Sequence, residues 1–322
     1  MSFTATAERF ALREVFTISR GSRTHAEVVH VVVTRGGISG QGECVPYPRY
    51  GESVQSVIAQ IQSLPGDIDR AALQQALPAG AARNAVDCAL WDWEAKAAGQ
   101  PVWQLAGIPA PQPVLSAYTL SLGAPDAMRE QAGRHAQRPL LKVKLGGGAA
   151  DVARIEAVRA GAPAARIIVD ANEGWSAEEY RRLGPVFLDL GVEMVEQPLP
   201  ADGDAALAGI DRPLPVCADE SCHDRASLPA LNGKYDMVNI KLDKTGGLTE
   251  ALALRDAARD AGFRVMVGCM VGSSLAMAPA LLVAQGAEVV DLDGPLLLAQ
   301  DRMPAMAFRA DGLHPAERAL WG

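Results

Sequence analysis

Three acidic residues in the middle of the chain are spaced so that they could bind one metal ion. Asp170, Glu196 and Asp219 follow one another at intervals of 26 and 23 residues, and each stands at the end of a short apolar run. Three hard oxygen ligands without a nearby histidine suit Mg²⁺, which prefers octahedral oxygen coordination and keeps positions for water or a substrate carboxylate. An acid at such a position can instead cap the helix that follows. Three acids in succession favour a metal site.

Lysines stand on both sides of this acidic series. Lys142 and Lys144 precede the first acid, and Lys241 follows the last acid by 22 residues. This arrangement fits a substrate held on Mg²⁺ with one base on each face of a carbon next to a carboxylate. The metal would stabilise the enediolate, and a deprotonated lysine would remove the proton. Lysines are more often solvated, but these end otherwise apolar runs, so we predict that Lys144 and Lys241 are the two catalytic bases.

The elements that must position these residues form a repeat of strands and helices. Short β-branched runs predict eight strands, separated mostly by stretches of helix-forming composition. The strands are expected at residues 114–120, 140–145, 166–170, 193–197, 215–219, 237–241, 264–268 and 288–293. This pattern predicts parallel βα units closed into a barrel, in which the chemistry lies at the carboxyl ends of the strands. A doubly wound open sheet is the alternative, but Leu120-Ser121-Leu122-Gly123 is not the glycine-rich phosphate turn that such a sheet usually has.

The first hundred or so residues have a different pattern. Residues 28–33 and 38–45 are typical of a β-hairpin, and apolar residues then recur at helical spacing from Val54 to Ala97. This segment is therefore expected to be of the α+β type. The predicted division of the chain is an α+β capping domain at residues 1–112, to which residues 299–322 return, and a catalytic barrel at residues 113–298.

Composition excludes several classes of protein. The 322 residues are 49% hydrophobic, which is enough for a large core. No apolar stretch reaches the roughly 20 residues that span a bilayer, and the first residues lack the regions of a secretory signal, so we expect a cytoplasmic protein without a membrane partner. Five cysteines at scattered spacings predict reduced thiols. A net charge of −8 without a basic stripe argues against a nucleic-acid partner.

The residues singled out so far resemble those of the enolase superfamily, in its muconate lactonizing enzyme subgroup. Five motifs fall in order, one per strand: Lys142-Val143-Lys144, Val169-Asp170-Ala171-Asn172, Val195-Glu196-Gln197-Pro198, Ala218-Asp219-Glu220-Ser221 and Asn239-Ile240-Lys241-Leu242-Asp243-Lys244. The resemblance implies an α/β fold, a modified (β/α)7β TIM-like barrel with an α+β capping domain. It also implies one Mg²⁺ per subunit, since a lysine base with Mg²⁺ stabilising the enolate is the established chemistry of this superfamily.

Further motifs resemble the dipeptide epimerases of that superfamily, and among them the L-Ala-D/L-Glu epimerases. Asp291-Leu292-Asp293 is similar to their Asp-x-Asp motif, whose two carboxylates receive the α-ammonium group of the dipeptide. Residues 20–23 and 46–53 resemble the two loops that close over the barrel in that family. The resemblance implies that Arg23 binds the side-chain carboxylate of the glutamyl residue, and that Thr119 lines the same pocket.

The implied activity is that of an isomerase, a Mg²⁺-dependent dipeptide epimerase. It would invert the Glu α-carbon of L-Ala-D/L-Glu in the recycling of murein peptides. Lys142 is assigned to substrate binding, whereas Asp243 and Lys244 receive no role. A small dipeptide is the expected partner, and the oligomeric state, a homo-oligomer included, is left open.

Other functions stay open as alternatives. N-acylamino-acid racemases, o-succinylbenzoate synthases and cycloisomerases share the scaffold, but their substrates carry no free ammonium group for the Asp-x-Asp motif. A catalytically silent peptide-binding protein is an alternative from another class, and the filled set of catalytic and ligand positions argues against it. Mandelate racemase-like and dehydratase reactions need a histidine at the seventh strand, where this chain has Val267-Gly268-Cys269-Met270.

Overall fold

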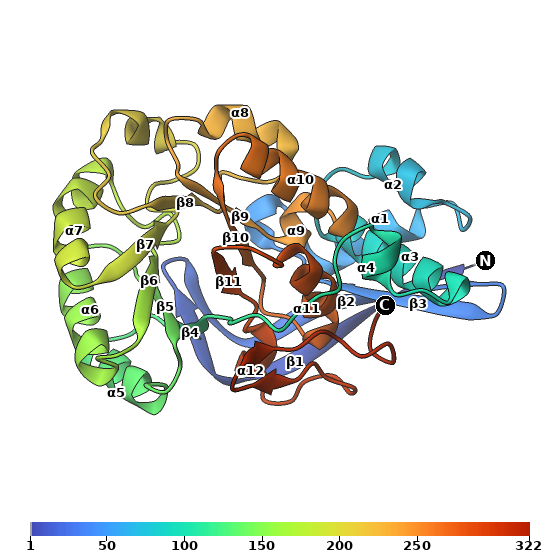
Figure 1. The fold of residues 1–322 in the computed structure, drawn as a ribbon, viewed down its shortest axis with the longest axis horizontal. Coiled ribbons are helices and arrows are strands. Elements are labelled where there is room, and N and C mark those ends of the chain that lie inside the picture. The colour runs from blue at the N-terminus through green and yellow to red at the C-terminus, as the bar shows by residue number, and fades with distance from the viewer. Residues whose placement is uncertain (1) are drawn as a thin grey trace.

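The larger part of the chain forms a parallel barrel. In the computed structural model, which describes residues 2–322, eight strands pair in the order β11-β10-β9-β8-β7-β6-β5-β4. The Ala117 amide donates to the Val290 carbonyl at 2.8 Å and joins the two outer strands of this sheet. The strands are β4 (Tyr118–Leu120), β5 (Leu140–Lys144), β6 (Arg166–Asp170), β7 (Val192–Glu196), β8 (Val216–Ala218), β9 (Met237–Ile240), β10 (Arg264–Gly268) and β11 (Val289–Asp291). The predicted barrel fold is confirmed (Figure 1).

Helices surround the barrel and connect its strands (Figure 1). They are α5 (Pro125–Arg134), α6 (Ala150–Gly161), α7 (Ala177–Asp189), α8 (Leu228–Leu231), α9 (Leu242–Thr245), α10 (Leu248–Asp260), α11 (Ser274–Val283) and α12 (Gly294–Leu297). One connection differs from the regular repeat, because β7 and β8 are joined by the 3₁₀ helix η2 (Asp204–Gly209). Pro198, Pro200 and Pro213 in this connection disfavour a longer α-helix, since proline lacks the amide donor.

Alternation along the strands places two kinds of side chain inside the barrel. In β5, β6 and β7, the first inward side chain of each strand is apolar. Two residues further along, the next inward side chain is charged: Lys142, Asp170 and Glu196. The outward residues between them pack against the surrounding helices. At the amino ends of the strands, an apolar ring fills the interior: Ala117, Leu140, Ile168, Met194, Cys217, Met237, Met266 and Val289. The barrel therefore has an apolar end and a charged end.

The cap is the layer formed by the N-terminal elements. It holds an antiparallel sheet and four helices: β1 (Ser2–Ile18), β2 (Gly21–Arg35), β3 (Ile38–Cys44), α1 (Val54–Gln62), α2 (Arg70–Ala76), α3 (Ala81–Ala98) and α4 (Val102–Leu105). The predicted hairpin corresponds to β2 and β3. Strand β1 was not predicted, because its alanines and charged residues leave no continuous β-branched run. Pairing with β2 along nearly its whole length compensates, from Ser2 opposite Thr34 to Ile18 opposite Gly21.

The sheet of the cap packs closely on α3. Gly40 and Gly42 of β3 face this helix, and a Cβ at either position would overlap backbone atoms of Ala85 or Ala89. Only glycine allows the strand and the helix to approach so closely. The tight contact fixes the position of β2, and with it the hairpin turn that leads to the barrel.

The turn between β1 and β2 reaches the charged end of the barrel. The Ser19 hydroxyl and the Arg20 guanidinium both donate to the Asn172 carbonyl at 2.9 Å. Nearby, the Leu122 amide donates to the Thr17 carbonyl at 3.0 Å. A loop of the cap is thus held against the mouth of the barrel by hydrogen bonds to backbone carbonyls.

The last residues of the chain contact both parts. The short strands β12 (Phe308–Arg309) and β13 (Gly312–Leu313) pair with each other, and Leu313 also bridges to Val114. The Trp321 indole donates to the Cys88 carbonyl of α3 at 3.0 Å. The domain boundaries at 112 and 298 stay a prediction.

The cysteines and the helices agree with two expectations from composition. All five cysteines are free thiols, and four of them are buried. Among residues 2–322, every helix is too short or too polar to cross a membrane.

Candidate active site

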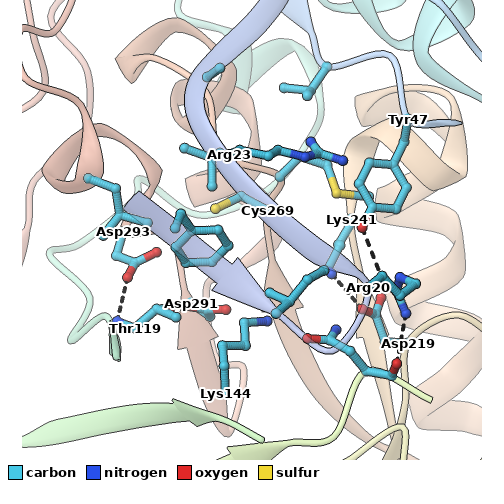
Figure 2. A pocket seen from close by; sticks show the side chains of 18 of the residues that line it. Arg20, Arg23, Tyr47, Thr119, Lys144, Asp219, Lys241, Cys269, Asp291 and Asp293 are labelled. Atoms are coloured by element: carbon cyan, nitrogen blue, oxygen red, sulfur yellow. Dashed lines mark hydrogen bonds and ion pairs between the residues drawn. The ribbon is translucent and has the colours of Figure 1, made fainter. Parts of the chain in front are cut away.

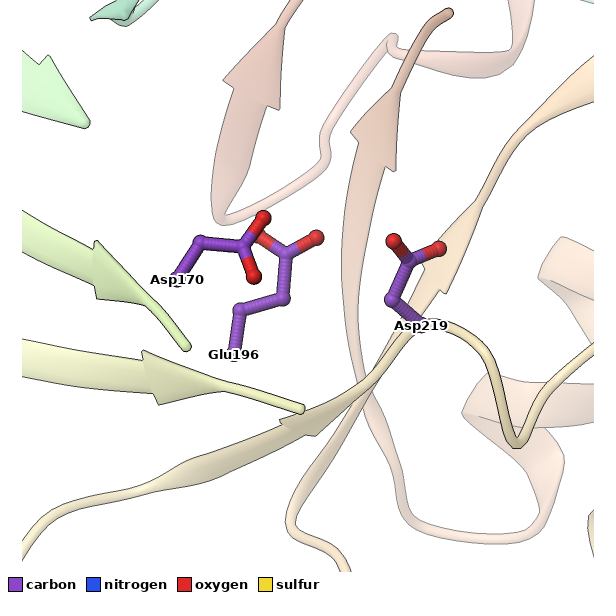
Figure 3. Close-up of side chains that lie close together, drawn as sticks. All are labelled: Asp170, Glu196 and Asp219. Carbon is purple, nitrogen blue, oxygen red and sulfur yellow. The ribbon is translucent and has the colours of Figure 1, made fainter. Parts of the chain in front are cut away.

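The three predicted metal ligands converge at the charged end of the barrel. Asp170, Glu196 and Asp219 end or follow the adjacent strands β6, β7 and β8, and all three are buried (Figure 3). Each offers one carboxylate oxygen, and these oxygens lie within 4.8 Å of one another. We call these residues the acidic triad. Their oxygens are the kind of ligand that Mg²⁺ prefers, and they lie close enough together to share one ion.

The two predicted bases lie at opposite ends of the acidic triad. Nζ of Lys144 is 2.6 Å from Oδ2 of Asp170, and Nζ of Lys241 is 2.5 Å from Oδ2 of Asp219. Both lysines line one cavity beneath the cap, as Figure 2 shows. Two amines thus face a common space from β5 and from the end of β9, the strands on either side of those that carry the triad.

Lys142 lies deeper in the barrel than either predicted base. Its ammonium group is 2.7 Å from Glu196, 2.8 Å from Asp291 and 3.3 Å from Asp170. Burial disfavours the charge, but these carboxylates outweigh it and raise the pKa of Lys142 well above the usual range. Lys142 therefore links the acidic triad to the eighth strand, and it also lines the cavity.

The charges of the site determine the protonation states of its carboxyl groups. Burial would raise the pKa of Asp170, but the ammonium groups of Lys144 and Lys142 lower it to about 2. For Asp219, Lys241 and Lys244 likewise outweigh burial and hold the pKa well below the usual range. Burial and the charge of Asp170 raise the pKa of Glu196. A bound cation would help to keep all three acids ionised.

The predicted Asp-x-Asp motif lies on the wall of the same cavity. Oδ2 of Asp293 accepts from the Thr119 amide at 2.6 Å (Figure 2). Burial and the neighbouring charge of Asp291 raise the pKa of Asp293 to about 7, whereas Asp291 is paired with Lys142. One carboxyl group of this motif therefore already has a cationic partner. The other has none among the described residues and is suited to an incoming ammonium group.

Arg23 enters the cavity from the cap. Its guanidinium lies over the ring of Tyr47, 5.0 Å from the centroid, and both residues line the cavity together with Thr119. In the described part of the chain, Arg23 has no carboxylate partner within 4.0 Å. A free planar fork of donors beside an aromatic ring is well suited to a carboxylate of the substrate.

The sequence did not identify a second set of residues that holds the cap over the mouth. Arg20 binds Glu220 at 2.7 Å and Glu173 at 3.2 Å, and it donates to the Tyr47 hydroxyl at 3.1 Å. Arg49 makes two further hydrogen bonds to Glu173, at 2.8 and 2.9 Å. Arg20 lies in the loop of residues 20–23, which was expected to close over the barrel, but nothing in the local sequence points to these distant partners.

Asn239 is another residue that sequence reasoning missed. It is fully buried, and its amide donates to Oε1 of Glu196 at 2.8 Å. Alternation was an available signal, because Asn239 stands two residues before Lys241 and must face the same side of its strand. Its neighbour Gly268 is also constrained, since a Cβ there would overlap the Asn239 side chain.

Comparison with known families covers nearly the whole chain. The family model "Mandelate racemase / muconate lactonizing enzyme, N-terminal domain" matches residues 1–107, and the model "Enolase C-terminal domain-like" matches residues 127–296. The two matches correspond to the cap and to the barrel. They agree with the resemblance noted in the sequence.

Two curated relatives align with the chain over most of its length. The L-Ala-D/L-Glu epimerase of Escherichia coli (strain K12) is 51% identical over 313 residues, which cover 95% of this chain and 97% of the relative. The N-acetyl-D-glutamate racemase of Pseudoalteromonas sp. is 44% identical over 302 residues, which cover 92% of this chain and 95% of the relative. The relatives thus act on two related glutamyl compounds.

Solved structures share the fold. One is an enolase family member from Agrobacterium tumefaciens, described as homologous to dipeptide epimerases and bound to sodium and L-Ala-L-Glu with an ordered loop. It is 53% identical, with a TM-score of 0.96 and 99% of both chains covered. A dipeptide epimerase from Cytophaga hutchinsonii, complexed with Mg and D-Ala-L-Val, is 28% identical, with a TM-score of 0.90 and 99% of this chain and 95% of that chain covered. From its fold, its family matches and these relatives, the chain belongs to the mandelate racemase and muconate lactonizing enzyme family of the enolase superfamily.

Proposed function

We propose that this protein is a Mg²⁺-dependent dipeptide epimerase that inverts the glutamyl α-carbon of L-Ala-D/L-Glu. The observation that carries the proposal is the pairing of Lys144 and Lys241, which both line one cavity, with the two outer members of the acidic triad. The relative of the same activity, 51% identical, supports the choice of substrate.

The acidic triad fits the proposed cation. Its three oxygens converge in a buried site without a histidine or cysteine ligand among the described residues, as a hard divalent ion requires. Asp170, Glu196 and Asp219 would hold one Mg²⁺ per subunit. When bound, the ion supplies positive charge beside the substrate carboxylate and so stabilises the negative charge that develops when the α-proton leaves.

The cavity offers a partner for each charged group of the dipeptide. Arg23 would bind the γ-carboxylate of the glutamyl residue, because its guanidinium stacks on Tyr47 and pairs with no carboxylate of residues 2–322. Asp293 and Asp291 would receive the alanyl ammonium group, with Thr119 holding Asp293 in place. Lys142 would contribute a fixed positive charge near the α-carboxylate. The α-carbon would then lie between Lys144 and Lys241.

The two lysines perform the proton transfer. The neutral amine of one lysine takes the α-proton, and the electron pair of the broken C–H bond passes into the carboxylate, which gives the enediolate. The ammonium group of the other lysine then donates a proton to the opposite face, and the new C–H bond has the inverted configuration. Asp219 and Glu196 outweigh burial and raise the pKa of Lys241 well above the usual range, so in the structure this lysine is in the proton-donating state.

The test is an exchange experiment in D₂O followed by NMR. L-Ala-L-Glu incubated with protein and Mg²⁺ should gain deuterium only at the glutamyl α-carbon and form the D-epimer. EDTA should abolish the reaction, and so should Lys144→Ala combined with Lys241→Ala. If the wild-type protein exchanges no α-proton across a panel of dipeptides, the proposed function is wrong.

N-acylamino-acid racemisation is the second candidate. The N-acetyl-D-glutamate racemase among the relatives favours it, and so does the pairing of Asp291 with Lys142, which reduces the need of the Asp-x-Asp motif for a cation. A direct comparison of L-Ala-L-Glu with its N-acetylated form separates the two. Equal turnover of both would remove the ammonium-binding role of Asp291 and Asp293.

The physiological setting completes the proposal. From the resemblance to the L-Ala-D/L-Glu epimerases, we infer that the enzyme acts in the cytoplasm on peptides released from murein. A mutant lacking the gene should accumulate the unepimerised dipeptide when cell-wall fragments are taken up. Normal levels of that dipeptide would contradict the recycling role without affecting the chemistry.

A further inference from the structure

Lys244 is a buried lysine that the proposed reaction does not use. Its side chain is inaccessible to solvent, and it does not line the cavity, unlike Lys241 three residues earlier. Its ammonium group contacts three oxygens: Oδ1 of Asp219 at 2.6 Å, the Asp219 carbonyl at 2.5 Å and the Asn239 carbonyl at 2.9 Å. Three donors with three acceptors leave this group no proton to share with a substrate.

Asp219 lies between the two lysines. One of its carboxylate oxygens, Oδ1, contacts Lys244, and the other, Oδ2, contacts Lys241 at 2.5 Å. The short helix α9 begins directly after Lys241 and carries Lys244 in its first turn. Residues three apart on a helical turn point to the same side, so both lysines reach one carboxylate. The result is a fixed lysine, a carboxylate and a lysine that faces the cavity.

The opposite side of the site is supported differently. Asp170, the partner of Lys144, accepts from the Asn172 backbone amide at 2.8 Å and from its side-chain amide at 3.2 Å. Asp170 is therefore held by the turn that follows its own strand. Asp219 has no such turn contact to its carboxylate among the described residues, and Lys244 takes that place.

We propose that Lys244 is a positioning residue for Lys241. It holds Asp219 by one oxygen, so that the other oxygen keeps a constant direction and sets the place to which the Lys241 ammonium group returns after each proton transfer. Without Lys244, Asp219 can rotate, and Lys241 loses its fixed position beside the substrate. Lys144 keeps its own support. This inference rests on the proposed function, and it predicts an effect on one face of the reaction only.

The face-specific effect can be measured by following α-proton exchange of L-Ala-L-Glu and L-Ala-D-Glu separately in D₂O at saturating Mg²⁺. The variant Lys241→Ala identifies the epimer served by Lys241, because exchange of that epimer is lost while the other still exchanges at Lys144. In Lys244→Met, the ratio of the two exchange rates should change in the same direction by at least about tenfold, a part of the 10²–10⁴ that a general base contributes.

The ratio is taken within one preparation, so a loss of folded protein does not alter it. If Lys244→Met does not fold, Lys244→Gln provides the same readout with a smaller change in polarity. Lys234→Met is the matched control, since Lys234 forms a comparable pair with Asp204 at 2.5 Å and does not line the cavity. Its ratio should equal that of the wild type.

Each outcome decides the inference. An unchanged ratio overturns it, whether exchange of both epimers falls equally or neither changes. Calorimetric titration with Mg²⁺ then shows what Lys244 does instead, because loss of an outer partner of a metal ligand commonly weakens metal binding 10–100-fold. If the wild type exchanges neither epimer, the proposed function fails first, and the two failures are thereby distinguished.

Discussion

The two ends of the barrel interior differ in the work that their side chains do. The apolar ring fills the amino end with aliphatic and sulfur-containing residues that are all buried. Two residues further along β5, β6 and β7, the same inward face carries Lys142, Asp170 and Glu196, which are equally buried. Because the strands are the same, the difference lies only in residue type. It separates a part of the molecule that stabilises the fold from the part to which we assign the chemistry.

The energetics of the two ends follow from this difference. Burial of apolar side chains stabilises the folded state by about 25 cal/mol per Å² removed from water. Burial of charges costs free energy that pairing only partly returns, so a buried ion pair adds little net stability. The charged end tolerates this because four of its carboxylates and its lysines compensate one another. Substitutions at the two ends should therefore have separable effects.

The largest effect is expected at the charged end, on catalysis. Lys144→Met should lower kcat/KM by on the order of 10³-fold, equivalent to about 4 kcal/mol, because one of the two proposed bases is lost. The free energy of unfolding should change less than in the apolar-ring variant described next, since Asp170 keeps Lys142 and the Asn172 donors. Steady-state kinetics and urea denaturation measure the two quantities. A variant that is active but unfolds easily would reverse the proposed division.

The matching change at the apolar end should affect stability instead. Ile168→Ala, two residues before Asp170 on β6, should lower the free energy of unfolding by about 3 kcal/mol, because a buried cavity replaces three carbon atoms. The activity of the molecules that remain folded should be unchanged. Urea denaturation and kinetics normalised to the folded fraction provide the measurement. A tenfold loss of activity per folded molecule would show that the ring also positions the site.

Acid pH should distinguish Asp170 from Ile168, the charged and the apolar position of β6, by about 2 kcal/mol. The folded pKa of Asp170 is about 2, below its ordinary value of 3.8, so its stabilising contribution is present above pH 4 and is lost as the pH falls through 2. In metal-free protein, Asp170→Asn should remove this part of the pH dependence, whereas Ile168→Ala should lower stability equally at every pH. Denaturation midpoints between pH 2 and 6, in EDTA, test this. Parallel curves for wild type and Asp170→Asn would contradict the assigned pairing.

The sequence allowed much of the fold and the polar residues at the mouth to be predicted, because each depends on a local pattern. The strands β6 and β10 have the predicted bounds, since β-branched runs with clear ends mark buried parallel strands. Lys144 and Asp170 could be placed together because both end neighbouring strands. Strand β1 and the 3₁₀ connection η2 were not predicted, as both depend on what the chain packs against.

The contacts between cap and barrel could not be predicted from local patterns. Arg20 meets Glu173 and Glu220 only after the cap hairpin has folded over the mouth, and these residues are more than 150 positions apart in the chain. Lys244 was visible in its motif but had no role, because its three acceptors include two backbone carbonyls. Charge and spacing show which residues can act, whereas tertiary packing decides which of them are free to do so.

The smallest effect is expected for the ion pair outside the apolar end. Arg166 is the first residue of β6, and Glu193 lies within β7. Nη2 of Arg166 is 2.7 Å from Oε2 of Glu193, and the two side chains are 52% and 41% exposed. Solvent screens such a pair, so a double-mutant cycle with Arg166→Ala and Glu193→Ala should give a coupling of about 0.2–1 kcal/mol, smaller at high salt. The buried pair of Lys144 on β5 and Asp170 on β6 lies at the opposite, charged end of the barrel, where the salt dependence should be weaker. A coupling between Arg166 and Glu193 above about 2 kcal/mol that salt does not reduce would mean that charge also stabilises the apolar end. The two ends would then differ in catalysis alone.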